Sequence, residues 1–290
     1  MKKFIEVLPI VCLLLVAISC DKKGDNIVAL SSAVFVHASP GTPSVQVYLD
    51  TLLQSIPTNA SYSISYASTL SSNTTFSSGY VGIYPIAHNI SFENRTTTPK
   101  KVFAALRDGF AGNEFYSYFL YDTLEQGQVK VLRLIDDLTT PPAGNANVRF
   151  LNLAPRSPAL DITFVRGSSF VDTTSSSAGV AVFIASDSVT ISNKPYVGPS
   201  PDANSLAKFI SIPGSSGNAA TTKAKGITAL PAEFKNNRYI IKLKAAGTQT
   251  VLAQSAQTTL NAGSIYTVFA RGTAQGQPLG ISLYANYLLF

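Results

Sequence analysis

A serine nucleophile is usually activated by a histidine base, and histidine is rare in this 290-residue chain. The two histidines are His37 and His88. His37 lies two residues before Ser39, and Asp50 follows one strand later, so these three could form a nucleophilic triad. An internal repeat places Asn152 at the position of His37, and an amide cannot accept a proton as a general base. We therefore interpret His37 as a structural residue that braces the turn after it, and His88 as an ordinary strand-edge histidine.

Four oxygen-bearing side chains, Asp136, Asp137, Asn145 and Asn147, could together bind calcium. No Asp-x-Asp-x-Asp-Gly loop is present, so a solvated turn is the preferred interpretation. The sequence also has no nucleotide-binding glycine motif, phosphate loop or zinc-ligand spacing. We predict that the protein has no metal and no cofactor, and that it is not an enzyme.

Cys20 is the residue with the clearest predicted chemistry, because of what precedes it. Lys2 and Lys3 are followed by the apolar run from Val7 to Ile18, and then by Ser19 and Cys20. This pattern resembles a bacterial lipoprotein signal peptide. The resemblance implies cleavage before Cys20, a diacylglycerol on its sulfur and usually an amide-linked acyl chain. At ~0.8 kcal/mol per buried CH₂, two or three chains anchor a protein stably.

A membrane-spanning helix is the alternative interpretation of this first segment. Glu6 and Pro9 interrupt it, and the apolar run is shorter than the ~20 residues that cross a bilayer. We therefore expect residues 1–19 to be the signal peptide and residues 20–31 to be the lipidated Cys and a tether. The expected location is the outer membrane, and the body could face the periplasm or the cell surface. Apart from Cys20, this mature protein has no cysteine, which excludes internal disulfides and thiolate catalysis.

The rest of the chain has the pattern of short strands. Val45, Val47 and Leu49 alternate with polar residues, and 240–243 and 265–270 alternate in the same way. No segment has a convincing helical period. We therefore predict an all-β protein in which lysines 242 and 244 lie on the wet face of a strand.

An internal repeat divides the chain into two tandem domains. Residues 35–47 align with 150–162 at an offset of 115, and both have a strand, a Pro-x-x-Pro turn and a strand. Residues 116–119 align with 266–269 at an offset of 150, so the second copy carries about 35 additional residues, which we expect between Gly167 and Pro231.

These alignments set the predicted domain boundaries and fold. Both domains are expected to be β-sandwiches of immunoglobulin-like or transthyretin-like type. The Pro-Pro pair between them breaks a sheet ladder and stiffens the joint. We predict domain 1 at 32–138, a Pro-rich linker at 139–146, and domain 2 at 147–290, with a mobile inserted loop at about 194–226.

Two of these elements also resemble a known family. The segments 36–50 and 261–270 are similar to the family catalogued as domain of unknown function 4397, which is secreted and often lipid-anchored. The resemblance covers both copies, and the second departs from the pattern at Asn152 and Arg156. It implies an extracytoplasmic β-sandwich and supplies no reaction.

The net charge of the predicted mature chain limits the kinds of partner that it is expected to bind. Removing residues 1–19 takes away Lys2, Lys3 and Glu6, which leaves 20 basic and 15 acidic side chains. This mild excess, without a basic-aromatic motif, argues against nucleic acid. We expect a non-enzymatic cell-envelope lipoprotein that acts as a binding or structural module for a glycan or an envelope protein, an acidic glycan being favoured over nucleic acid. The alternative is a hydrolase of envelope or extracellular polymers that uses loop carboxylates.

Four sites resemble the O-glycosylation signal of exported proteins in one phylum of Gram-negative bacteria, an Asp followed by Ser or Thr and then a small or aliphatic residue or Thr. The predicted acceptors are Thr51, Thr123, Thr173 and Ser188. Ordinary turn dipeptides, in which Asp, Ser and Thr side chains bond the local backbone, give the same pattern.

Overall fold

The computed structural model describes residues 29–53, 63–69, 79–94, 98–124, 129–174, 178–198, 201–215, 221–223, 235–274 and 276–287. The predicted signal peptide, Cys20 and most of the predicted tether therefore lie outside the described residues. Within those ranges the elements are strands and one short helix, α2 (Ala203–Leu206), which confirms the all-β prediction. No helix in the described ranges is long and apolar enough to cross a membrane.

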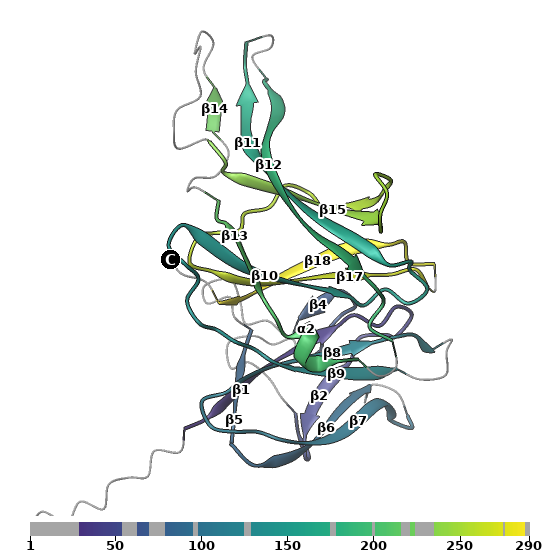
Figure 1. The fold of residues 1–290 in the computed structure, drawn as a ribbon. Helices are drawn as coiled ribbons and strands as arrows, with labels where there is room; N and C mark the ends of the chain where they lie inside the picture. Colours follow the sequence, from purple (N-terminus) through teal and green to yellow (C-terminus); the bar gives the residue numbers. More distant parts are fainter. Residues whose placement is uncertain are drawn as a thin grey trace, which may run out of the picture.

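The first half of the chain forms two sheets that enclose a hydrophobic core (Figure 1). Inner sheet 1 has the strand order β4-β1-β8-β9, with β5 also paired to β1, and outer sheet 1 has the order β3-β2-β6-β7. In chain order these strands are β1 (Ser31–His37), β2 (Gln46–Leu49), β3 (Leu52–Leu53), β4 (Ser68–Thr69), β5 (Val81–Ile83), β6 (Ala87–Asn94), β7 (Lys101–Gly109), β8 (Phe115–Tyr121) and β9 (Lys130–Ile135).

The second half forms two further sheets around its own core. Inner sheet 2 has the order β13-β10-β17-β18, and outer sheet 2 has the order β12-β11-β15-β16, with β14 also paired to β11. These strands are β10 (Asn145–Asn152), β11 (Leu160–Asp172), β12 (Val180–Lys194), β13 (Ile210–Pro213), β14 (Thr221–Lys223), β15 (Arg238–Ala245), β16 (Val251–Gln254), β17 (Ile265–Arg271) and β18 (Gly280–Tyr287).

The two halves share their pairing register as well as their strand order. β1 runs parallel to β8 with Ser32 opposite Phe115, and β10 runs parallel to β17 with Asn147 opposite Ile265. Asn147 lies 115 residues after Ser32, and Ile265 lies 150 residues after Phe115, which are the two offsets of the sequence repeat. The antiparallel pairs β8–β9 and β17–β18 also correspond. The repeat seen in the sequence is therefore a repeat of the fold.

The additional residues of the second half do not form one loop. The predicted loop at 194–226 contains α2 and β13, and β13 pairs with β10 at the edge of inner sheet 2. Ile212 of β13 is fully buried, and its pairing with Ala146 corresponds to the pairing of Ile83 with Ser31 in the first half. The prediction of a solvent-facing loop is thus wrong at β13, because flanking Pro and Gly residues mask a strand of only four residues.

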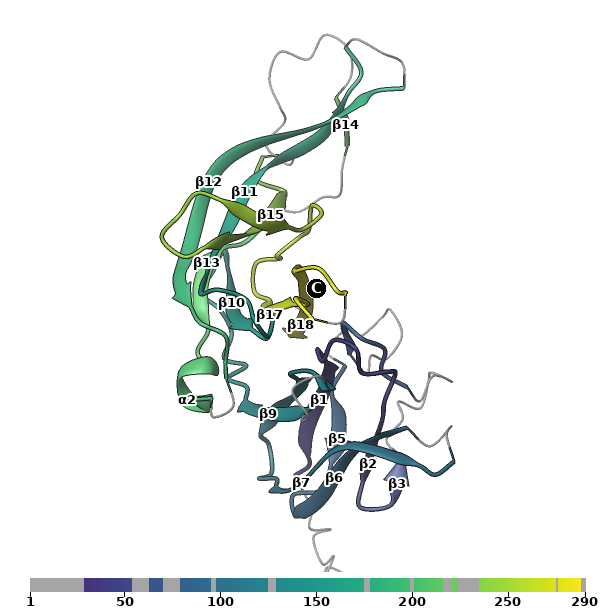
Figure 2. The same ribbon diagram turned by 90° about the vertical axis from the view of Figure 1, so that its right-hand side faces the viewer.

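The two inner sheets pack against each other through apolar side chains, so the molecule has four layers (Figure 2). Phe119 of β8 meets Phe269 of β17 edge to face, with ring centroids 6.1 Å apart. These two residues are 150 apart and occupy equivalent positions in the two halves. The halves therefore meet around an approximate two-fold axis.

The hairpin of β11 and β12 extends past the rest of outer sheet 2 and projects from the molecule (Figures 1 and 2). β15 pairs with β11 only as far as Gly167. Beyond it, β11 pairs with β12 and with the short β14. Figure 1 shows this hairpin at the top, with β1 and β5 at the lower left, so it points away from the end where the described chain begins.

Candidate functional site

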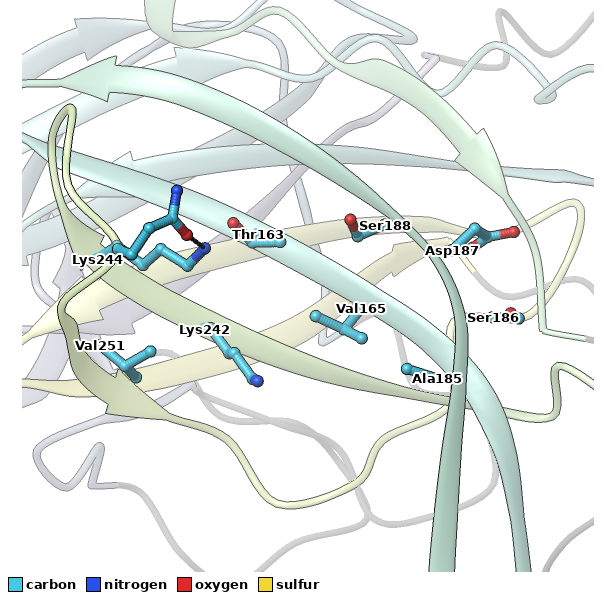
Figure 3. A pocket seen from close by; sticks show the side chains of 10 residues that line it. Thr163, Val165, Ala185, Ser186, Asp187, Ser188, Lys242, Lys244 and Val251 are labelled. Atoms are coloured by element: carbon cyan, nitrogen blue, oxygen red, sulfur yellow. Dashed lines mark hydrogen bonds between the residues drawn. The ribbon is translucent and has the colours of Figure 1, made fainter.

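A hollow of about 480 Å³ lies on the solvent-facing side of outer sheet 2 (Figure 3). Strands β11, β12, β15 and β16 and the turn between β15 and β16 supply its walls. The lining residues are Thr163, Val165, Ala185, Ser186, Asp187, Ser188, Lys242, Lys244, Gln249 and Val251.

Strand alternation places these side chains on the outer face. In β15, Ile241 and Leu243 are buried in the core, so Lys242 and Lys244 between them face outward. The prediction that both lysines lie on the wet face of a strand is confirmed. Lys242 pairs with Thr163 of β11, so a lysine and a hydroxyl lie side by side across the sheet.

The hollow carries positive charge. Lys244 Nζ donates a hydrogen bond to Gln249 Oε1 at 2.8 Å, and Lys242 has no ion-pair partner among the described residues. The carboxylate of Asp187 accepts hydrogen bonds from Arg166, at 3.1 Å from Nε and 2.5 Å from Nη2. This bonding raises the pKa of Arg166. Arg166 neutralises Asp187, and Asp161 interacts with Lys244 across the sheet, so Lys242 supplies the unpaired positive charge of the hollow.

A β-bulge shapes one wall of the hollow. Arg166 pairs with Asp187 and Gly167 with Ala185, so Ser186 has no residue opposite it. Ser186 Oγ donates a hydrogen bond to Asn236 Oδ1 at 2.6 Å, and this bond fixes the position of the extra residue. A Cβ on Gly167 would come within 2.4 Å of the Ile184 carbonyl oxygen, so this close approach of the two strands requires glycine.

These groups are suited to binding an anion that also carries hydroxyl groups. Ammonium groups and serine hydroxyls offer hydrogen bonds to carboxylate, sulfate and sugar oxygens. The lining residues include no histidine, and Asp187, their one carboxylate, is held by Arg166. They also include no aromatic ring on which a sugar could stack. The lining therefore supports binding through charge and hydrogen bonds, without a pair of groups for acid–base catalysis.

His37 lies far from this hollow and has the structural role predicted for it. It is fully buried, and its Nε2 lies 3.2 Å from the Thr42 carbonyl oxygen and 3.1 Å from that of Pro43. Its Nδ1 accepts a hydrogen bond from the Ser39 backbone N–H at 3.3 Å. Burial lowers the pKa of His37. The ring thus braces the Pro-x-x-Pro turn.

Asn152 makes the equivalent contacts in the second half. Its Nδ2 donates to the Pro158 carbonyl oxygen at 3.4 Å, and its Oδ1 accepts from the Ala154 backbone N–H at 3.2 Å. Pro158 and Ala154 lie 115 residues after Pro43 and Ser39. The interpretation of both residues as turn braces is confirmed.

The triad of His37, Ser39 and Asp50 does not form. Asp50 instead pairs with His88, whose Nδ1 lies 2.7 Å from Asp50 Oδ2. Hydrogen bonds from Asn89 and from His88 lower the pKa of Asp50. The interpretation of His88 as an ordinary strand-edge residue is therefore incomplete. The pairing of β2 with β6 brings these distant residues together, which no local pattern reveals.

Asp136 lies in a buried polar network between the inner sheets, which the sequence did not reveal. Its Oδ1 is 2.6 Å from Arg149 Nη1, and both side chains are inaccessible to solvent. Arg149 Nε donates to Thr267 Oγ1, and its Nη2 donates to Ser117 Oγ, each at 2.9 Å. Ser117 and Thr267 are equivalent positions of the two halves, so the network lies at the approximate two-fold axis.

This network also bears on the calcium alternative. Two further donors, Tyr80 OH and Ser117 Oγ, each lie 2.5 Å from Asp136 Oδ2, so this carboxylate is saturated. Asp137 accepts a hydrogen bond from the Thr139 backbone N–H in an exposed turn. No group of three or more His, Cys, Asp and Glu side chains that could hold a metal occurs among the described residues.

The predicted glycosylation sites have different surroundings. Thr51 lies in an exposed turn after β2, and Ser188 is exposed on β12 within the hollow. Thr173 is partly buried and directly follows β11. Thr123 is fully buried, so the folded protein has no room for a sugar there, and that prediction is wrong. A Thr after a strand can face the core, and the dipeptide pattern does not report which way it faces.

One known protein family is similar in sequence to the first half of the chain. Residues 31–163 match the DUF4397 family model. The family is described as a domain of unknown function. The DUF4397 match covers β1 to β10 and ends at Thr163 in β11, so most of the hollow lies outside it. No curated protein matches the chain.

Proposed function

We propose that this protein is a non-enzymatic lipoprotein of the bacterial outer membrane that binds an acidic glycan in the hollow of outer sheet 2. In this proposal Cys20 carries the lipid anchor, and both halves are copies of the DUF4397 domain. The shared strand order and register of the halves support the second copy, beyond the segment that the family model matches.

The single observation that carries the proposal is the charge of the hollow. Lys242 lies in a space of about 480 Å³ without an ion-pair partner among the described residues, and Arg166 occupies the one carboxylate of the lining. An anion placed there would gain an ion pair without displacing an existing one. The exposed Ser188 adds a hydroxyl group for the neutral oxygens of the same ligand.

The position of the hollow suits a binding role. Outer sheet 2 is the layer farthest from outer sheet 1, and the described chain begins in the first half (Figure 2). A lipid anchor before residue 29 would hold the first half near the membrane. The hollow and the projecting hairpin would then face away from the bilayer, where an extended glycan is accessible.

A glycan array tests the proposal with matched charge variants. The wild-type protein, Lys242→Gln and Lys101→Gln are compared, because Lys101 is an exposed lysine on β7 of the first half. We expect wild type and Lys101→Gln to bind glycans bearing carboxylate or sulfate, and Lys242→Gln to lose that binding. Equal binding by all three proteins would contradict the assigned site.

The competing function, hydrolysis of an envelope polymer, is tested with the same ligands. We expect each bound glycan to be recovered intact after prolonged incubation. Chain cleavage that is abolished by one Asp or Glu substitution would contradict the non-enzymatic proposal.

A further inference from the structure

Four large apolar side chains are exposed at the end of the first half where the described chain begins. They are Leu30 at 47% exposure, Leu52 at 71%, Tyr84 at 66% and Ile86 at 60%. We call these four residues the entry face. Single exposed apolar side chains are common, whereas several gathered at one end of a domain indicate a binding surface.

Contacts within the first half gather these residues. The Leu30 side chain lies against Gly82, at the start of the segment that carries Tyr84 and Ile86. The Ile86 carbonyl oxygen accepts a hydrogen bond from the Phe110 backbone N–H. These contacts place Leu30, Tyr84 and Ile86 on neighbouring loops.

The pair of Asp50 and His88 connects Leu52 to the same end. His88 Nε2 lies 3.2 Å from the Tyr84 carbonyl oxygen, and Asp50 is two residues before Leu52. The Asp50 carboxylate beside the entry face is held by hydrogen bonds with His88 and Asn89. The segments 82–87 and 109–113 contain no charged residue. The four side chains of the entry face are apolar, and Asp50 lies beside Leu52.

We propose that the entry face docks on the lipid bilayer. This inference rests on the proposed lipid anchor at Cys20. Residues 21–28 separate that anchor from the start of the described chain, and at about 3.5 Å per residue they reach about 30 Å. The end of the domain that carries the entry face is therefore the part of the body held closest to the membrane.

The chemistry of the entry face suits the interface between lipid headgroups and acyl chains. Leucine and isoleucine side chains transfer favourably from water to the acyl boundary, and tyrosine concentrates at the headgroup level. The predicted tether carries two lysines and two aspartates, so its charges balance and the apolar side chains supply the attraction to the bilayer. Docking would restrict the orientation of the body and keep outer sheet 2 turned away from the bilayer.

The absence of tryptophan from the chain makes a direct test possible. A single tryptophan is introduced by Tyr84→Trp, by Ile86→Trp or, as the matched control, by Val251→Trp on the exposed part of β16. Each full-length protein, produced with its lipid, is reconstituted into vesicles of phosphatidylcholine and phosphatidylglycerol with or without brominated acyl chains. Emission wavelength and quenching are measured, and flotation of the vesicles reports the anchor separately.

We expect brominated lipid to quench Tyr84→Trp and Ile86→Trp, with emission shifted to shorter wavelength, and to leave Val251→Trp unchanged. Flotation of all three proteins with no difference in quenching would overturn docking and leave the anchor intact. Loss of flotation would overturn the anchor, and docking with it. A shift to shorter wavelength that grows with the amount of protein per vesicle, without quenching by brominated lipid, would identify a second protein molecule as the occupant and would also overturn the proposal.

Discussion

The buried ion pair of Arg149 and Asp136 predicts how strongly the two halves are coupled. Replacing Arg149 with Met keeps an apolar stem of similar length and leaves the Asp136 carboxylate without its counter-ion. Both side chains are inaccessible to solvent, so water cannot substitute for the lost charge. Removing one partner of a buried pair costs about 3–5 kcal/mol. We expect Arg149→Met to lower the free energy of unfolding by about that amount.

Urea unfolding followed by circular dichroism measures this loss, and Arg166→Met is the matched control. Arg166 pairs with Asp187 at the surface, where the Asp187 side chain is 45% exposed, so its loss should cost only about 0–1 kcal/mol. The double variant Arg149→Met with Asp136→Leu should be less destabilised than the sum of its single variants, because it leaves no unpaired buried charge. Equal effects of Arg149→Met and Arg166→Met would refute the reasoning.

Four further predictions concern the fold. His37→Asn should keep near wild-type stability because Asn152 fills the same role, whereas His37→Ala should lose about 1–3 kcal/mol in thermal unfolding. Because burial lowers the pKa of His37 below 6.5, the unfolded chain binds more protons, so stability should fall as the pH drops below about 6.5, less so in His37→Asn. Gly167→Ala should cost about 1–3 kcal/mol by forcing β11 and β12 apart, and unchanged stability would contradict the close approach at the bulge. Ile212→Ala should cost about 2–5 kcal/mol, and no cost would show that β13 is not part of the core.

The repeat made much of the fold predictable from sequence. Strand alternation is a local property of the sequence. The outward position of Lys242 and Lys244 could therefore be predicted, because they alternate with apolar residues that the structure buries. The match of 35–47 with 150–162 predicted that the chain folds the same way twice, and the pairing registers bear this out. In that alignment Asn152 occupies the position of His37. This indicated that His37 braces a turn and does not act as a base, and the hydrogen bonds of both residues agree.

The remaining features depend on residues that meet only in the folded chain. Arg149 lies on β10, and Asp136 directly follows β9. The residue pattern of these strands does not indicate that the two inner sheets face each other. The hollow similarly requires β11, β12, β15 and β16 to be neighbours in one sheet. The short strand β13 was missed because four residues carry too little periodicity to be distinguished from a loop.

Calorimetric titration of the strongest acidic glycan from the array tests the central claim most directly. Wild type, Lys242→Gln and Lys101→Gln are titrated at two salt concentrations. If the hollow is the binding site, wild type and Lys101→Gln should bind with affinity that falls as salt rises, and Lys242→Gln should lose roughly ten-fold or more, the effect of about 1.4 kcal/mol. An affinity that is unchanged in Lys242→Gln would contradict the assignment of the hollow as the binding site.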